Sequence, residues 1–317
     1  MNITPVAMAK QTTAVLLMAY GTPRCVEEIL PYYTDIRRGR VPTTEQLADL
    51  TARYNAIGGV SPLVARTEAQ RDVLCRELDI LAPGKFHVQL GFKHSHPMIE
   101  ETVADLARQG YSRIIALVLA PHFSEYSVGQ YMSRASESAQ SLGMAVAGIS
   151  SWAVEPAFIN FLSIELTNKL TAMAGYSTRP HVLFTAHSLP QRIIDSGDPY
   201  PTELRSTASA IASRLNIAEG LQWTIAWQSA GRTPEPWIGP DILTVIDQIA
   251  SGGESDGVVV CACGFVADHL EVLYDIDIEA RLRAEQLGLA FARTDCVNDD
   301  QTVMSALAHR VIAANTE

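Results

Sequence analysis

Two consecutive segments indicate the fold: Gly257-Val-Val-Val-Cys261 and, after two further residues, Gly264-Phe-Val-Ala-Asp-His-Leu-Glu-Val-Leu-Tyr-Asp-Ile-Asp-Ile-Glu279. The first has the length and β-branched content of a strand that is covered on both faces. The second turns and continues as a helix, on which Glu271, Asp275 and Glu279 lie four residues apart and share one face. Like charges at this spacing repel one another. The pattern is typical either of a solvated acidic face or of a face that handles cations or protons.

Strand-length apolar runs alternate with helical patterns along the whole chain. The strand-length runs are residues 14–18, 87–92, 114–119, 145–149, 182–185, 224–227, 258–261 and 289–292. The helical patterns are residues 44–54, 97–109, 128–142, 156–173, 200–215, 240–249, 268–287 and 301–313. Such alternation predicts parallel sheets joined by right-handed crossovers.

The predicted fold class is therefore α/β, with two similar Rossmann-like lobes that each hold a four-stranded parallel sheet flanked by helices. The turn-rich segment Gly175–Pro180 predicts the joint between the lobes. We expect an N-terminal lobe over residues 12–174 and a C-terminal lobe over residues 175–317.

Composition excludes several classes of protein. The net charge of −11 leaves no basic stripe for nucleic acid or anionic lipid. No apolar run reaches the roughly 18 residues of a membrane span, and Met1–Thr13 lacks the apolar core of a signal peptide. The five cysteines form an odd, scattered set that is typical of reduced thiols. The sequence predicts a cytoplasmic protein with no stable membrane anchor.

Polar and aromatic side chains follow most of the predicted strands. Ligands of open parallel sheets bind beyond the carboxyl ends of the strands, so these side chains mark a candidate site. They include Tyr20, Lys93, His94, Ser124 and His187. The imidazole of His187 and the carboxylate of Glu271 belong to the same predicted lobe. Such a pair suits proton abstraction near neutral pH or transient ligation of a divalent metal.

Other motifs are absent or weak. The first strand is not followed by GxGxxG or GxxxxGK[ST], so a nucleotide site lacks its phosphate cradle. No Cys/His set has the spacing of a closed zinc site. Cys261 and Cys263 are typical of buried thiols, with a metal pair as the alternative. His94 and His96 form a lone HxH pair, for which a structural role and a metal site both remain open.

Arginines are concentrated in one short segment near the N-terminus. Arg37, Arg38 and Arg40 lie within four residues, and Arg53 lies at the end of the next helical pattern. Arginine binds carboxylates through a two-pronged contact, which favours a substrate with several carboxylates, while a solvated surface is the alternative. Aromatic residues near the strand ends, Trp237 among them, are suited to packing against a flat macrocycle.

Eight long motifs resemble those of the ferrochelatases, and the resemblance extends from Leu16 to about Asn315. The motifs are LLMAYGTP (16–23), YYTDIRRGRVP (32–42), RYNAIGGVSPL (53–63), LAPHFS (119–124), TAHSLP (185–190), GDPYP (197–201), WQSAGRTPEPWIGPD (227–241) and GFVADHLEVLYDID (264–277). The resemblance implies the chelatase fold, with a porphyrin between the lobes, and insertion of ferrous iron with release of two pyrrole protons. The segments IRRGR and IGGVSPL resemble the soluble, monomeric Gram-positive-type enzymes, which metallate coproporphyrin III to coproheme.

The resemblance also implies roles for single residues. His187 and Glu271 match the catalytic pair and the metal ligands, and Tyr20 matches the residue that faces the macrocycle from the other side. Arg53, Asp275 and Glu279 match an outer cation site, for which Mg²⁺ is the candidate ion. The residues that match substrate-binding or pocket-edge positions are Arg37, Arg38, Arg53, Ser61, Lys93, His94, Ser124 and Trp237.

Iron is then a substrate, and no cofactor is required. Many relatives carry clustered cysteines in a C-terminal extension, but only Cys296 follows the CxC here, so we expect no [2Fe–2S] cluster. The expected partners are the porphyrin, ferrous iron and, transiently, neighbouring enzymes of haem synthesis.

Three alternatives remain open. A protoporphyrin IX ferrochelatase differs in whether the pocket demands four propionates or two. A cobalt chelatase of corrinoid synthesis has a similar fold, but its paired metal histidines are not evident. A tetrapyrrole or metal carrier needs no base, yet the His187–Glu271 pair is retained.

Overall fold

The computed structural model describes residues 12–215, 221–231 and 233–316, so most of the N-terminal segment examined for a signal peptide lies outside it. The described residues form two four-stranded parallel sheets, which confirms the predicted fold class. The first sheet has the order β2-β1-β3-β4 and the second β6-β5-β7-β8. Their strands are β1 (Thr13–Ala19), β2 (Phe86–Phe92), β3 (Arg113–Val118), β4 (Ala145–Ile149), β5 (Pro180–His187), β6 (Trp223–Gln228), β7 (Gly257–Cys261) and β8 (Ala290–Arg293).

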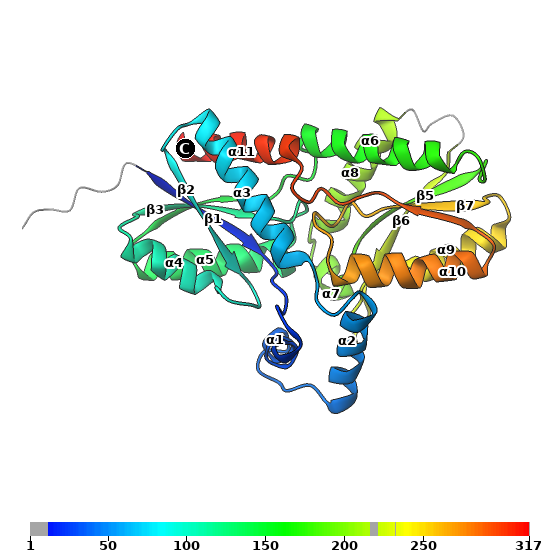
Figure 1. The fold of residues 1–317 in the computed structure, drawn as a ribbon, viewed down its shortest axis with the longest axis horizontal. Coiled ribbons are helices and arrows are strands. Elements are labelled where there is room, and N and C mark those ends of the chain that lie inside the picture. Colours follow the sequence, from blue (N-terminus) through cyan, green and yellow to red (C-terminus); the bar gives the residue numbers. More distant parts are fainter. Residues whose placement is uncertain (1–11, 216–220, 232, 317) are drawn as a thin grey trace, which may run out of the picture.

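Helices cover both faces of each sheet (Figure 1). The α-helices of the first half are α1 (Ile29–Ile36), α2 (Thr44–Ala56), α3 (Leu63–Leu81), α4 (Ile99–Arg108), α5 (Gln130–Ser141) and α6 (Pro156–Met173). Those of the second half are α7 (Gln191–Asp195), α8 (Tyr200–Arg214), α9 (Ile242–Gly252), α10 (Arg281–Gln286) and α11 (Gln301–Thr316). The sequence patterns did not predict α1, α3 or α7.

One apolar core is shared by the two sheets. Val15 and Leu17 of β1 belong to it together with Val182 and Phe184 of β5. The intervening strand residues face the other way, because successive side chains of a strand point to opposite faces. Each sheet therefore has a second, separate core on its outer face, under α4 and α5 in the first lobe and under α9 in the second.

Two helices cross between the lobes. Helix α6, which precedes the predicted joint, packs on β7 and β8 of the second sheet. The C-terminal α11 runs back over α3, β3 and β4 of the first sheet, as its place beside α3 in Figure 1 shows. The predicted division at residues 174 and 175 stays a prediction, since packing extends across it in both directions.

Two helical segments have the i→i+5 hydrogen bonds of a π-helix. Such helices are rare overall, and many of them lie at functional sites. They are Glu125–Gly129, after β3, and Val272–Ala280, after β7. The predicted helix over residues 268–287 is thus a π-helix that continues as α10. Helices α1 and α2 project away from both sheets (Figure 1). No helix among the described residues is long and apolar enough to cross a membrane.

Candidate active site

The site lies where the strand order of the second sheet reverses. Strand β5 has β6 on one side and β7 on the other, and the crevice between the carboxyl ends of β5 and β7 is the position where such sheets bind ligands. His187 is the last residue of β5, and Glu271 follows β7. The Nε2 atom of His187 lies 3.5 Å from Oε1 of Glu271. The two side chains are 34% and 35% exposed, so a ligand can reach both.

A glycine lets the loop after β7 approach β5. The backbone N–H of Gly264 donates to the Thr185 carbonyl at 2.9 Å. A Cβ atom at position 264 would lie only 2.3 Å from Cβ and 2.5 Å from Cα of Ala186. No side chain fits in this space, so a glycine is required where the loop that leads to Glu271 packs on the strand that ends in His187.

A second imidazole, which the sequence analysis missed, joins the pair. Nε2 of His269 lies 3.6 Å from Oε2 of Glu271, so each carboxylate oxygen faces one imidazole. His187 donates from Nδ1 to the Ser188 carbonyl, and His269 does the same to the Ala267 carbonyl at 2.9 Å. When the rings are neutral, both Nε2 lone pairs point at the carboxylate. This arrangement is favourable only with a proton or a cation between the groups.

The electrostatics of the pair follow from this geometry. Burial lowers the pKa of His187, but the Glu271 carboxylate outweighs that effect, and the net pKa lies above the ordinary value. Burial likewise raises the pKa of Glu271, but His187 and then His269 hold it well below the ordinary value. Glu271 is therefore ionised throughout the physiological range, and His187 holds a proton more readily than a free imidazole. Among the described residues no three His, Cys, Asp or Glu side chains are arranged as a ready metal site.

The first lobe supplies the opposite wall. Tyr20 follows β1, and its side chain remains 40% exposed. The pKa of Tyr20 is raised well above the ordinary value, by desolvation and then by the Glu271 carboxylate. The Tyr20 ring lies 4.6 Å from the ring of His94, whose Nδ1 atom is 2.6 Å from Oδ2 of Asp35.

Lys93 is a buried cation beside Tyr20. Its Nζ atom lies 6.0 Å from the ring centre of Tyr20 and 5.0 Å from that of Tyr131. Burial, and then the charges of Arg134 and Arg38, lower the pKa of Lys93 to about 8. Among the described residues no carboxylate pairs with Lys93, so it can receive an acidic group from a ligand.

Trp237 lies beside His187. The two ring centres are 6.4 Å apart. The loop that carries Trp237 is fixed to the His187 loop, since Ser188 Oγ donates to the Ile238 carbonyl at 2.7 Å. Gly231 makes room for the indole, because a Cβ there would lie 2.4 Å from the Trp237 ring.

The outer acidic groups connect the two lobes. Arg53 of α2 pairs with Asp275 of the π-helix at 3.2 Å, and its guanidinium stacks 4.8 Å from the Tyr274 ring centre. Ser229 donates to the other Asp275 oxygen. Burial, followed by the charge of Glu271, raises the pKa of Asp275 to about 6, and Glu279 contributes in the same direction. The acids of this face therefore do influence one another, as the four-residue spacing predicted.

The remaining predicted binding residues differ in burial and in whether another residue already pairs with them. No carboxylate among the described residues pairs with Arg37 or Arg38, although the Arg37 guanidinium lies 5.5 Å from the Tyr33 ring centre. Ser124 is fully buried, and its hydroxyl donates to Asp198 at 2.9 Å. Ser61 is buried, and its Oγ accepts from the Leu63 N–H at 3.3 Å. The geometry therefore brings the arginines, but not Ser124, to a free surface.

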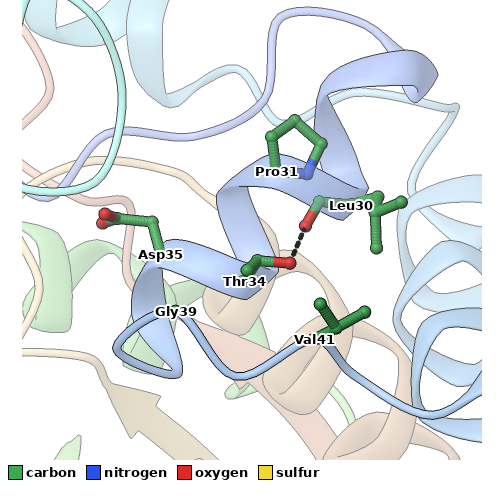
Figure 2. Close-up of a pocket in the computed structure, with 6 residues that line it drawn as sticks. All are labelled: Leu30, Pro31, Thr34, Asp35, Gly39 and Val41. Atoms are coloured by element: carbon green, nitrogen blue, oxygen red, sulfur yellow. Dashed lines mark hydrogen bonds between the residues drawn. The ribbon is translucent and has the colours of Figure 1, made fainter.

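A cavity of about 470 Å³ lies on the outer side of this region. Figure 2 shows its lining by α1 and the loop after it, with Leu30, Pro31, Thr34, Asp35, Gly39 and Val41. His187 and Glu271 do not line it. Asp35 connects the two places, because it borders the cavity and pairs with His94.

Comparison with known proteins identifies the family. The family model described as ferrochelatase matches residues 12–315. The chain is 41% identical over 298 residues to a protein of Herpetosiphon aurantiacus named ferrochelatase, covering 93% of this chain and 96% of the relative. It is 42% identical over 303 residues to the coproporphyrin III ferrochelatase of Halalkalibacterium halodurans, covering 95% and 96%.

Among solved structures, the fold is similar to that of the sirohydrochlorin chelatase SirB from Bacillus subtilis subspecies spizizenii in complex with cobalt. The TM-score is 0.54 at 11% identity, over 96% of this chain and 95% of that one.

Proposed function

The chain belongs to the ferrochelatase family, and from this premise we propose that it inserts Fe²⁺ into coproporphyrin III to give coproheme in haem biosynthesis. Relatives that carry the coproporphyrin name are 42% identical over nearly the whole chain. The observation that carries the proposal is the convergence of His187, Glu271 and His269 at the switch point of the second sheet, opposite Tyr20.

The chemistry requires two protons to leave the macrocycle and the ferrous ion to lose its water ligands. His187 and Glu271 replace those ligands as the ion arrives, since imidazole and carboxylate both bind it. Once the ion has passed to the macrocycle, neutral His187 accepts one pyrrole proton at Nε2 and the second leaves through Glu271; the Nδ1–H bond of His187 to Ser188 keeps Nε2 directed at Glu271. Glu271 stabilises the imidazolium that forms. A pocket that fits a distorted ring better than a flat one lowers the barrier further.

Free cations on the first lobe support a substrate with four carboxylates. Arg37, Arg38 and Lys93 have no acidic partner among the described residues, whereas Arg53 already pairs with Asp275. A buried cation, or an arginine that can make a two-pronged contact, contributes most to binding when a ligand carboxylate pairs with it. We assign Arg37, Arg38 and Lys93 to the propionates, with Ser61, His94 and Arg53 shaping the pocket edge and Trp237 its wall; Ser124, which is buried against Asp198, is not assigned a substrate contact.

The outer acids support a further role for the same helix face. Asp275 and Glu279, with Arg53 beside them, form a path along which cations or protons pass to Glu271, and Mg²⁺ is the ion proposed there. The reaction requires no resident cofactor, and we propose no [2Fe–2S] cluster. We also propose a cytoplasmic monomer that meets neighbouring haem-synthesis enzymes transiently, and the five free thiols fit a reducing compartment.

The test combines one substitution with two porphyrins. Iron insertion is followed by absorbance for coproporphyrin III and protoporphyrin IX, and porphyrin binding by fluorescence. The wild type should metallate coproporphyrin III in preference. His187→Ala should abolish insertion and retain binding, while His309→Ala, which removes an exposed imidazole on α11, should change neither.

Other outcomes favour other functions. Preference for protoporphyrin IX would indicate the two-propionate enzyme. Tight binding without insertion by the wild type would indicate a carrier. Normal turnover by His187→Ala would exclude the proposed role of that residue.

A further inference from the structure

A buried arginine lies behind the helix that carries the active-site acids. Arg293 is the last residue of β8, and its side chain is 12% exposed. Its Nε and Nη2 atoms donate to the two oxygens of Asp277 at 2.8 and 2.9 Å. Such a two-pronged contact fixes direction as well as distance, since both groups are planar. Asp277 belongs to the π-helix, so Arg293 ties this helix to the sheet.

The same guanidinium reaches the other end of the segment. Nη2 of Arg293 lies 3.4 Å from Oδ1 of Asp268, an oxygen for which the described residues provide no hydrogen bond. The rest of Asp268 is held by Asn298, which accepts from the Asp268 N–H at 3.0 Å and donates to Oδ2 at 2.9 Å. Arg293 is therefore the closest cation to the remaining oxygen, with Arg66 at 3.8 Å from Oδ2.

The two contacts of Arg293 hold both ends of the segment that carries the candidate catalytic residues. Asp268 and Asp277 stand at its two ends, and His269, Glu271 and Asp275 lie between them. Asp275 pairs with Arg53, while Asp277, two residues further, pairs with Arg293 on another side of the helix. In Figure 1 the π-helix and α10 form one continuous rod along the second sheet, so a shift of the rod would move Glu271.

We infer that Arg293 is a positioning residue for iron insertion: it holds the segment from Asp268 to Asp277 so that His269 and Glu271 converge on His187. The inference rests on the proposed function, because it gives Arg293 no contact with porphyrin or iron. Its effect is on the rate of insertion, and the porphyrin-binding cations of the first lobe lie outside the segment that it holds.

The decisive variant is Arg293→Lys, which keeps the charge but loses the two-pronged contact. Because misplacing a reacting group by about 1 Å can cost roughly 100-fold in rate, kcat should fall about 10- to 100-fold. The dissociation constant for coproporphyrin III should stay within about twofold, which a general loss of structure would not produce. Asp277→Asn, which weakens the same contact from the other side, should give the same separation.

The chain offers a matched control. Arg283 of α10 pairs with Asp247 at 2.6 Å, on the same helical rod but away from the cleft. Arg283→Lys should leave both kcat and porphyrin affinity unchanged. Thermal unfolding of every variant identifies those that fold. If Arg293→Lys does not fold, the kcat and porphyrin affinity of Asp277→Asn decide the question.

The outcomes separate this inference from the proposed function. Wild-type kcat in a folded Arg293→Lys or Asp277→Asn variant would overturn the positioning role and leave the function intact. An equal loss of kcat and porphyrin affinity would also overturn it, since that result indicates general disorder of the site. Failure of the wild type to metallate any porphyrin would instead overturn the proposed function.

Discussion

Replacing Gly264 by alanine should both destabilise the protein and slow iron insertion. The added Cβ would lie 2.3 Å from Cβ of Ala186, whereas ordinary contact begins at 3.4 Å. The shortfall of about 1.1 Å has to be absorbed by backbone, because alanine has no rotamer that could move aside. Either the end of β5 or the loop after β7 must shift.

The close contact at position 264 determines both the loss of stability and the loss of rate. An extra methyl group in a packed core costs about 1–3 kcal/mol, and the upper end applies because Cα of Ala186 is also too close, at 2.5 Å. Ala186 directly precedes His187, and Gly264 begins the loop to Glu271. A displacement of about 1 Å between these groups should therefore lower kcat by up to roughly 100-fold.

Urea unfolding and the absorbance assay measure the two effects separately. The control is Gly252→Ala at the end of α9, where no atom lies within 4 Å of the new Cβ. That variant should keep wild-type activity and be equally or slightly more stable, since alanine favours a helix by up to about 1 kcal/mol. A Gly264→Ala protein with the wild-type unfolding midpoint and kcat would refute the reasoning.

Three predictions concern pH. Glu271→Gln removes the charge that raises the pKa of His187. In a pH–rate profile, the remaining activity should therefore decline on the acid side at a lower pH than in the wild type. An unchanged position of this decline would contradict the prediction. Burial lowers the pKa of His122 to about 3, so below pH 6.5 the unfolded chain binds a proton that the native protein does not. Urea unfolding should therefore show about 3 kcal/mol of lost stability from this group by pH 4, and His122→Gln should flatten the decline. The pKa of Lys93 is lowered to about 8, so coproporphyrin affinity, followed by fluorescence, should weaken above pH 8 in the wild type and persist in Lys93→Arg.

Apolar runs predicted the two sheets because their inner strands, β1, β3, β5 and β7, are buried along almost their whole length. Helix α3 escaped the same reasoning, since Thr67, Gln70 and Glu77 are buried polar residues that interrupt its apolar pattern. The partners of Gln70 are the carbonyls of Val266 and Asn298, at 3.3 and 2.9 Å. These partners lie nearly 200 residues or more from Gln70 in the sequence, so no pattern near Gln70 indicates them.

The candidate site was predictable to the extent that strand ends define it. His187 ends β5 and Glu271 follows β7, and the carboxyl-end rule brings such residues together. No sequence pattern marks His269, because only the turn before the π-helix directs its ring at Glu271. Arg293 had no signal at all, since its importance depends on which helix lies against β8.

The crossing of α11 has a consequence for synthesis on the ribosome. Residues 301–316 are synthesised after both sheets, yet together with α3 they cover the face of the first sheet that carries Val15 and Leu17. Until α11 is made, the part of that apolar face over β3 and β4 lacks one of its covering helices. Nascent chains that stop before residue 301 should accordingly bind chaperones, even though His187 and Glu271 have already been made.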